Sequence, residues 1–330
     1  MDHTRLGRTG LQVSRLCLGT MTFGGQCDEQ TSRAILDTAA GGGITFLDTA
    51  DAYPLGGTLE TVGRTEEILG RWLRGRRHDF VVGTKCFNAM SDRPWDRGNS
   101  RKHVLDAIDR SLQRLGTDYV DLYQLHHPDP ETPIDETLRA LDDVVRSGRV
   151  RYVGCSNFQA WQVARAIGRS EVLGVVRFES VQPRYSLLFR EFERELFPLC
   201  REESLGVIVY NPLAGGLLTG KHRREAGPPA GSRFTLGTAG KMYQERYWNE
   251  GTFEAVDALR ALARETGLDP VTMAIAWVMA NPVVTAPIIG ASRPEQLTAS
   301  LAAAAVKLPA DLKGRLDALT DEYRKGDAER

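Results

Sequence analysis

The stretch Gly43-Ile-Thr-Phe-Leu-Asp48-Thr-Ala-Asp-Ala-Tyr53 decides how the rest of the chain is interpreted. Its mainly apolar run, 44–47, predicts a short buried strand. Asp48 lies where that strand should end, and Tyr53 follows five residues later in the loop. The segment therefore places a carboxylate and a phenol at the carboxyl end of one strand.

Two later segments have the same form. Phe80-Val-Val-Gly-Thr-Lys85 predicts a strand that ends on a lysine, and Tyr119-Val-Asp-Leu-Tyr-Gln-Leu-His126 predicts one that ends on a histidine. A single charged residue at a strand end is usually a solvated loop residue, and a lone Tyr or His usually packs or forms hydrogen bonds. The argument therefore depends on four polar groups at equivalent positions of three successive strands. If these strands are parallel and adjacent, the four groups meet at one rim.

Strand-like and helix-like segments alternate along the whole chain. Eight strands are predicted, at 16–19, 44–48, 80–85, 119–125, 150–155, 175–181, 207–210 and 284–289. Helices are predicted after them, near 28–40, 60–74, 100–115, 134–147, 159–168, 192–203, 251–266, 270–280 and 294–304. This alternation predicts a parallel sheet covered by helices, and eight units favour a closed (β/α)8 barrel, the TIM barrel. Active sites of such barrels lie at the carboxyl ends of the strands.

Three further features complete the predicted fold. Residues 3–14 suggest a small hairpin that caps one end of the barrel, and a long Gly- and Pro-rich loop at 219–250 follows the seventh strand. No GxGxxG follows the first strand, which argues against an open dinucleotide-binding sheet. Since no linker or composition shift divides the chain, a single domain over 1–330 is expected.

Bulk properties exclude several classes of partner. The 330 residues carry 42 Lys and Arg against 43 Asp and Glu, so charge gives no argument for binding nucleic acid or a membrane. The five cysteines are scattered and form no CxxC, which favours reduced thiols in the cytoplasm over disulfides or zinc. No segment approaches the about 20 apolar residues of a membrane-spanning helix, and the first residues lack the apolar core of a signal peptide. Oligomeric state cannot be inferred from the sequence.

The predicted rim constellation is suited to proton donation. A phenol of pKa ~10 is a weak acid, but a neighbouring ammonium should lower its pKa. Asp48 would keep Lys85 charged, Tyr53 would act as general acid, and His126 could donate a hydrogen bond to a carbonyl oxygen. The group suits reduction of a small carbonyl compound by hydride. No metal site is expected, because His126 and His127 are neighbours whose side chains should point to opposite sides of the strand.

A hydride must come from a cofactor, and later rim residues could hold one. Ser156, Asn157 and Gln182 could grip a carboxamide, and Tyr210 could stack on a flat ring. The small-residue loop 211–217 and the segment Gly290-Ala-Ser-Arg293 follow strands seven and eight, where such barrels commonly bind phosphate.

The motifs resemble those of the aldo-keto reductase family nearly from end to end. They are Leu18-Gly-Thr-Met-Thr-Phe-Gly24, Asp48-Thr-Ala-Asp-Ala-Tyr53, Thr84-Lys85, Leu122-Tyr-Gln-Leu-His126, Gly154-Cys-Ser-Asn-Phe158, Gln182-Pro-Arg-Tyr-Ser-Leu-Leu188, Tyr210-Asn-Pro-Leu-Ala-Gly-Gly-Leu-Leu-Thr-Gly-Lys221 and Gly290-Ala-Ser-Arg-Pro-Glu-Gln296. The resemblance implies a (β/α)8 barrel that binds NADPH and reduces aldehydes and ketones.

The resemblance also implies a role for each matching position. Tyr53 would be the proton donor, with Lys85 and Asp48 as its tuning pair and His126 orienting the carbonyl. The implied cofactor-binding residues are Gly19, Thr20, Met21, Asp48, Ser156, Asn157, Gln182, Tyr210, Asn211, Pro212, Leu213, Gly215, Leu217, Lys221, Arg233, Gly290, Ser292, Arg293, Gln296 and Ser300.

One departure and one alternative remain. Many members end the last motif in Glu-Asn, where this chain has Ala299-Ser300; Arg293 still favours the phosphate of NADPH over NADH. The alternative is a nucleotide-sensing regulatory subunit similar to the potassium-channel β subunits, which share the barrel. The resemblance implies that those subunits tend to lack the rim histidine, so His126 favours the enzyme.

Overall fold

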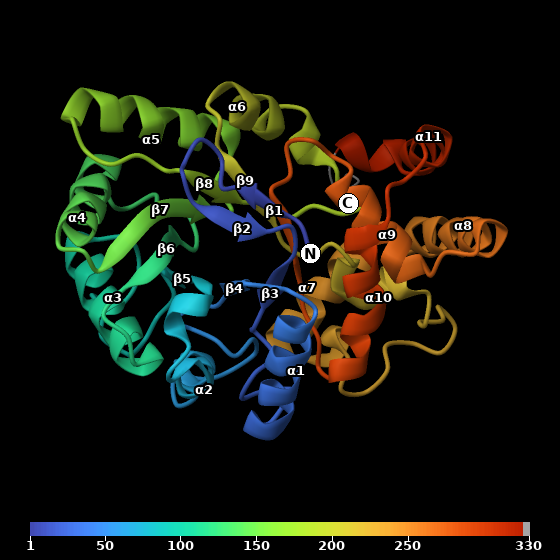
Figure 1. Cartoon of the computed structure of the whole chain (residues 1–330), viewed down its shortest axis with the longest axis horizontal. Helices are drawn as coiled ribbons and strands as arrows, with labels where there is room; N and C mark the ends of the chain where they lie inside the picture. Colours follow the sequence, from blue (N-terminus) through green and yellow to red (C-terminus); the bar gives the residue numbers. More distant parts are fainter. Residues whose placement is uncertain (326–330) are drawn as a thin grey trace.

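A computed structural model describes residues 1–325 of the chain, and eight strands in it close a parallel barrel (Figure 1). The order around the barrel is β10-β3-β4-β5-β6-β7-β8-β9. The strands are β3 (Cys17–Gly19), β4 (Phe46–Asp48), β5 (Val81–Cys86), β6 (Val120–Leu125), β7 (Val150–Ser156), β8 (Ser180–Gln182), β9 (Gly206–Val209) and β10 (Ala286–Ile289). The predicted (β/α)8 architecture is therefore confirmed, as is the antiparallel N-terminal hairpin of β1 (His3–Arg5) and β2 (Gln12–Ser14).

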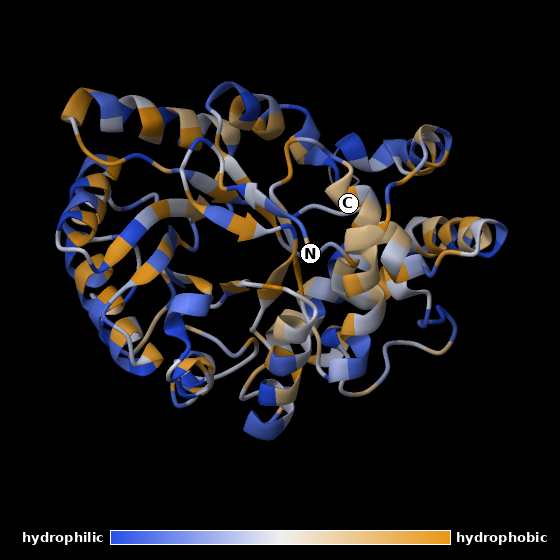
Figure 2. Ribbon diagram, in the orientation of Figure 1, coloured by the Kyte–Doolittle hydropathy of each residue, from blue (hydrophilic) through white to orange (hydrophobic). Residues whose placement is uncertain are grey.

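Helices cover the outside of the barrel. They turn apolar stripes toward the strands and polar faces outward, as the hydropathy colours of Figure 2 show. They are α1 (Glu29–Gly41), α2 (Arg64–Leu73), α3 (Arg101–Leu115), α4 (Ile134–Arg146), α5 (Ala160–Leu173), α6 (Leu196–Glu202), α7 (Gly237–Tyr247), α8 (Glu250–Thr266), α9 (Pro270–Met279), α10 (Leu297–Ala302) and α11 (Ala310–Leu319). None of the helices within residues 1–325 is long and apolar enough to cross a membrane.

The barrel interior changes character from one end to the other. At the amino ends of the strands it is apolar, and the hairpin closes it through Leu6 and Val13. The side chain of Leu6 lies against Gly206, where any Cβ would meet it at 2.5 Å. At the carboxyl ends the interior contains Asp48, Lys85, Gln124 and Gln182, all nearly inaccessible to solvent. The apolar end stabilises the barrel, and the polar end holds the candidate chemistry.

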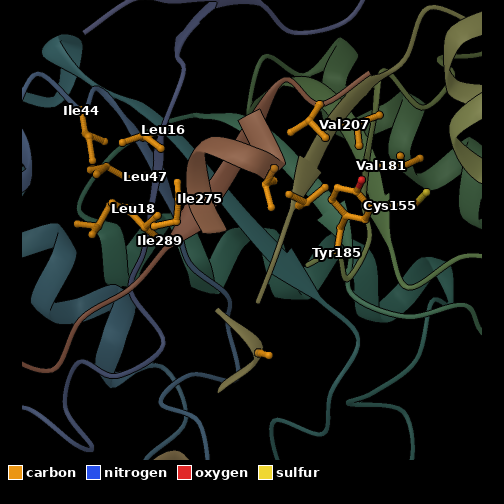
Figure 3. Close-up of a cluster of buried hydrophobic side chains, with 14 of the residues drawn as sticks. Leu16, Leu18, Ile44, Leu47, Cys155, Val181, Tyr185, Val207, Ile275 and Ile289 are labelled. Carbon is orange, nitrogen blue, oxygen red and sulfur yellow. The ribbon is translucent and has the colours of Figure 1, made fainter. Parts of the chain in front are cut away.

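A second apolar layer lies between the strands and the helices. Figure 3 shows Leu18 and Ile289 from adjacent strands beside Ile275 of α9, while Val181 and Val207 lie with Tyr185 in a separate group. Buried aliphatic side chains of this size contribute about 1.5–3 kcal/mol each. This packing fixes the strands, and hence the rim residues, in place.

Three segments differ from the sequence prediction. The segment predicted as the strand 175–181 forms a strand only over Ser180–Gln182. The predicted long loop contains the helix α7, whose positions 237–247 show too weak an apolar period to be recognised. The predicted closing helix is divided into η5 (Pro294–Gln296), α10 and η6 (Ala303–Ala305). Residues 326–330 lie outside the described part of the chain.

Candidate active site

Asp48, Lys85 and Tyr53 meet at the carboxyl end of the barrel. The ammonium Nζ of Lys85 lies 2.6 Å from Oδ2 of Asp48 and also donates to the backbone oxygen of Thr49 at 2.8 Å. The same Nζ donates to the hydroxyl of Tyr53 at 3.4 Å. Lys85 has no solvent exposure and Asp48 is 4 % exposed, so this is a buried ion pair with a phenol attached.

Two amides and a backbone contact hold Asp48 in place. Its Oδ1 accepts from Nε2 of Gln182 at 2.8 Å and from Nε2 of Gln124 at 3.4 Å. Its backbone oxygen accepts from the hydroxyl of Thr20 at 2.9 Å. Since both carboxylate oxygens have donors, the charge is satisfied without solvent. The carboxylate can therefore orient Lys85 precisely.

Burial and the ion pair have opposite effects on Lys85 and Tyr53. Burial lowers the pKa of Lys85, but Asp48 and Tyr53 together outweigh it, so its pKa is raised and the amine stays charged. Burial raises the pKa of Tyr53 by more than Lys85 lowers it. The expectation that the ammonium would bring the Tyr53 pKa below its ordinary value was therefore wrong, because desolvation of the phenolate dominates. Tyr53 remains a protonated donor at neutral pH.

His126 lies beside Tyr53, with ring centroids 5.8 Å apart in an edge-on arrangement. Burial, Lys85 and His127 lower its pKa well below the ordinary range, so the ring is neutral. Nδ1 of His126 lies 3.2 Å from the amide nitrogen of Asn88. The rings of His126 and His127 stack 5.1 Å apart, so the expectation that they point to opposite sides was wrong. Both residues lie beyond the end of β6, where strand alternation no longer applies.

The predicted carboxamide-binding residues form a hydrogen-bonded chain next to His126. Nδ2 of Asn157 donates to the backbone oxygen of His126 at 2.9 Å and to the hydroxyl of Ser156 at 3.1 Å. Oδ1 of Asn157 accepts from the Tyr210 hydroxyl at 2.8 Å. Ser156 in turn donates to the backbone oxygen of Gln182 at 2.8 Å. These side chains are thus assembled beside His126.

Three cations from two distant segments gather on another part of the rim. The charges of Arg293 and Arg233, together with burial, lower the pKa of Lys221. Burial is the largest cause of the lowered pKa. The two guanidinium groups lower it further, because like charges disfavour the ammonium. Arg233 also donates to Sδ of Met21 at 3.7 Å, which links the 219–250 segment to the loop after β3. None of the three cations forms an ion pair within residues 1–325.

The remaining predicted cofactor residues have varied surroundings. Asn211 already binds Tyr247 and the backbone of Gly215, at 2.8 Å and 2.6 Å. Gln296 accepts from the backbone nitrogen of Ser292 at 2.9 Å. Buried positions are Gly19, Thr20, Pro212, Leu217 and Ser300, whereas Leu213 is half-buried and Gly290 exposed. Because Leu217 and Ser300 are at most 2 % exposed, any contact with a ligand would require the chain to move.

Sequence reasoning missed two residues of this site. Gln124 lies two positions after Leu122 on β6, and this spacing places its polar side chain on the same, barrel-interior face of the strand. That signal was present in the sequence. Asn88 lies in the loop after Lys85, and nothing in the sequence indicates that its amide reaches His126.

The described residues form no group of three or more His, Cys, Asp or Glu that could hold a metal ion. All five cysteines are unpaired and buried. The site can therefore offer a buried ion pair, a phenol and a neutral imidazole, with amides on one side and cations on the other.

A family model described as the aldo/keto reductase family matches residues 15–321. The chain belongs to this family of oxidoreductases. Its fold, a closed eight-stranded barrel with a hairpin, agrees with that assignment.

Relatives with three kinds of name resemble the chain. An uncharacterised oxidoreductase of Bacillus subtilis, YrpG, is 41 % identical over 94 % of this chain and 94 % of its own. A probable voltage-gated potassium channel subunit beta of Oryza sativa is 38 % identical over 92 % and 91 %. The versiconal hemiacetal acetate reductase of Aspergillus parasiticus is 33 % identical over 93 % and 94 %.

Proposed function

We propose that the protein reduces an aldehyde or ketone to an alcohol, with NADPH as hydride donor and Tyr53 as proton donor. The observation that carries the proposal is the buried contact of Tyr53 with the Lys85–Asp48 ion pair, next to His126. Bound NADPH would supply the hydride. The other requirements, proton donation and carbonyl orientation, fall to residues of the chain.

The proton path follows from the hydrogen bonds. Tyr53 would donate its hydroxyl proton to the carbonyl oxygen as negative charge develops there. Lys85, 3.4 Å away, would stabilise the resulting phenolate, and Asp48 would keep Lys85 charged and in place. His126 would donate a hydrogen bond to the same oxygen and orient it. A positioned general acid of this kind typically contributes about 10²–10⁴-fold to rate.

The cation cluster of Lys221, Arg233 and Arg293 suits a dinucleotide with an extra phosphate. Lys221, Arg233 and Arg293 raise one another's electrostatic energy, and an anion among them would relieve that repulsion. The buried Nε of Arg233 has no hydrogen-bond partner within residues 1–325. We therefore favour NADPH over NADH. The amides of Asn157 and Gln182 would hold the carboxamide, and Tyr210 would lie against the nicotinamide ring.

Two further attributes complete the proposal. The substrate would be a small carbonyl compound, and no nucleic-acid or membrane partner is required by this chemistry. The five unpaired thiols suit a reducing compartment, so we place the protein in the cytoplasm.

A second candidate is a nucleotide-sensing regulatory subunit. It is favoured by the 38 % identity to a relative named as a probable potassium channel subunit beta. Such a role needs cofactor binding but not a proton donor beside an orienting imidazole. Because Tyr53, Lys85 and His126 are all present and in contact, we rank the reductase first.

The test is NADPH consumption with a panel of aldehydes and ketones, for wild type and Tyr53→Phe. The substitution removes one hydroxyl and little volume, so cofactor binding, measured by fluorescence quenching, should persist. We expect turnover to fall by about 10²–10⁴-fold. Cofactor binding without turnover on any carbonyl compound would instead support the regulatory subunit. Equal turnover in both proteins would remove Tyr53 from the role of proton donor.

A further inference from the structure

We propose that Asn88 is a positioning residue that fixes the tautomer of His126, leaving the ring proton on Nε2. The inference deepens the proposed function, because a carbonyl oxygen can accept a hydrogen bond only from a nitrogen that carries a proton. It also makes Asn88 and the loop that carries it part of the machinery for orienting substrate.

The hydrogen bond between the two side chains determines the tautomer. The amide nitrogen of Asn88 lies 3.2 Å from Nδ1 of His126. An amide nitrogen can only donate, so Nδ1 must accept and carries no proton. A neutral imidazole has one ring proton, which is then on Nε2. Within residues 1–325, Nε2 of His126 makes no hydrogen bond, so its proton is available to a ligand.

The neutral state of the ring follows from its surroundings. Its titratable and charged neighbours are Tyr53 at the ring edge, Lys85 from β5, and His127 stacked on its face. None of these contributes a negative charge at neutral pH. Burial disfavours the imidazolium first, and the Lys85 ammonium adds to that effect. The neutral ring of His126 therefore carries one proton, on Nδ1 or on Nε2, and the hydrogen bond from Asn88 selects Nε2.

The loop that carries Asn88 is clasped to the loop that carries His126. The backbone nitrogen of Gly98 donates to the oxygen of Phe87 at 2.7 Å and closes the base of the Asn88 loop. From there, Nδ2 of Asn99 donates to the backbone oxygen of His127 at 2.9 Å. The first bond holds the Asn88 loop in shape, and the second joins it to the segment after β6 next to the Asn88–His126 contact.

The outer part of the same loop is anchored to α3. Asp96 is 3 % exposed, accepts from Ser91 at 2.7 Å, and pairs with Arg110 at 2.9 Å. Arg110 and Ser91 together hold the pKa of Asp96 at about 2, so this anchor persists at any pH used for assay. Asn88 is thus held between two fixed points. A rigid support of this kind is what a positioning residue requires.

The direct test reads the ring proton itself. We would label the protein with [¹⁵N]histidine and record long-range ¹H–¹⁵N correlation spectra, assigning His126 with a His126→Gln variant. We expect wild type to show the Nε2–H tautomer. Asn88→Asp should change it to Nδ1–H, because a carboxylate can only accept. Asp92→Asn makes the reverse change at a neighbouring site of the same loop and should leave the His126 signals unchanged.

Kinetics supply the second measurement. At pH 8, Asn88→Asp should lose about 100-fold in kcat/KM, within the range for a misplaced acid–base group. Lowering the pH should restore part of it, because the new carboxylate raises the pKa of His126 and returns a proton to Nε2. Asn88→Leu, which keeps the branched shape of the side chain but has no donor, should lose less and show no such recovery.

The outcomes separate this inference from the proposed function. An Nδ1–H tautomer or an imidazolium in wild type would overturn it, even in an active reductase. An unchanged tautomer in Asn88→Asp would also overturn it. If wild type shows Nε2–H and the variant Nδ1–H, the inference holds, whether or not any carbonyl compound is turned over.

Discussion

Two regions of the same rim differ in whether their charged side chains are paired within the protein. Around β4, β5 and β6, the charged side chains are buried and paired: Lys85 with Asp48, and both oxygens of Asp48 with donors. Around β9, β10 and the 219–250 segment, Lys221, Arg233 and Arg293 gather without a carboxylate partner in the described residues. The charges of the first region are balanced within the protein, whereas those of the second repel one another.

The difference indicates which part of the work each region does. Groups that must be in place when charge develops gain from being fixed beforehand, since no reorganisation is then needed. Groups that must bind and release an anion gain from positive charge that no carboxylate of the protein neutralises. In the proposed reductase, the paired region would set the rate and the cationic region would set cofactor affinity. Substitutions in the two regions should therefore give different kinetic signatures.

Lys85→Met should have the largest effect, because it leaves Asp48 as a buried charge without a cation. Breaking a buried pair in this way typically costs about 3–5 kcal/mol in the free energy of unfolding. Urea unfolding would measure it, and Asp48→Asn/Lys85→Met should recover most of the loss without recovering turnover. Lys102→Met, in an exposed pair with Asp106, should cost less than about 1 kcal/mol. Equal costs for the two lysines would contradict the comparison.

The pH dependence of the same pair has a definite sign. The folded-state pKa of Lys85 is raised above its ordinary value. The pair therefore contributes fully below the ordinary lysine pKa, and its contribution is lost as the pH rises through the folded-state pKa. The stability difference between wild type and the double variant should be constant from pH 6 to 9 and should change only at more alkaline pH.

Arg293→Gln should act on the other region, with a smaller effect that is specific to one cofactor. We expect KM for NADPH to rise about tenfold, the equivalent of about 1.4 kcal/mol, while kcat and KM for NADH change little. Stability should not fall, because a repelling charge is removed. Arg315→Gln, an exposed arginine paired with Glu265, is the control for loss of one positive charge. Equal effects on NADPH and NADH would show that Arg293 does not read the extra phosphate.

Much of this architecture could be predicted because it depends on local signals. Eight alternating strand and helix units can be counted in the sequence, and the polar residues at the strand ends are visible without a structure. The positions of Asp48, Lys85 and His126 at one rim follow from parallel topology alone. Their roles could be proposed from the chemistry of the side chains, whereas most of the cofactor residues came from the family resemblance.

The remaining features depend on distances between segments. Asn88 reaches His126 only because two loops are clasped together, and no periodic pattern encodes that contact. The pKa of Tyr53 depends on a balance between burial and Lys85, whose sign the sequence could not give. The helix α7 was missed because its stabilising contacts are tertiary, including the packing of Tyr243 on Gly215 and Phe234.

Asp51 offers the finest test, since it lies three residues after Asp48 but lacks the partners of that acid. Within residues 1–325 both its carboxylate oxygens are buried without a hydrogen bond. Burial, with Glu66 nearby, raises its pKa well above the ordinary value. The folded state therefore favours protonated Asp51. The free energy of unfolding of the protein should fall as the pH rises above the ordinary aspartate pKa.

Asp51→Asn keeps the shape of the side chain but removes this titration. By urea unfolding, the variant should match wild type at or below about pH 4, the ordinary aspartate pKa, and exceed it by at least about 1 kcal/mol at pH 8. Asp118→Asn, at an exposed position, should show no such divergence. A variant less stable than wild type at pH 8 would mean that Asp51, like Asp48, works as a carboxylate. Asp48 and Asp51 would then both be stabilised as carboxylates. The contrast between the two regions would hold only for their cations, which are paired in one region and, among the described residues, unpaired by carboxylates in the other.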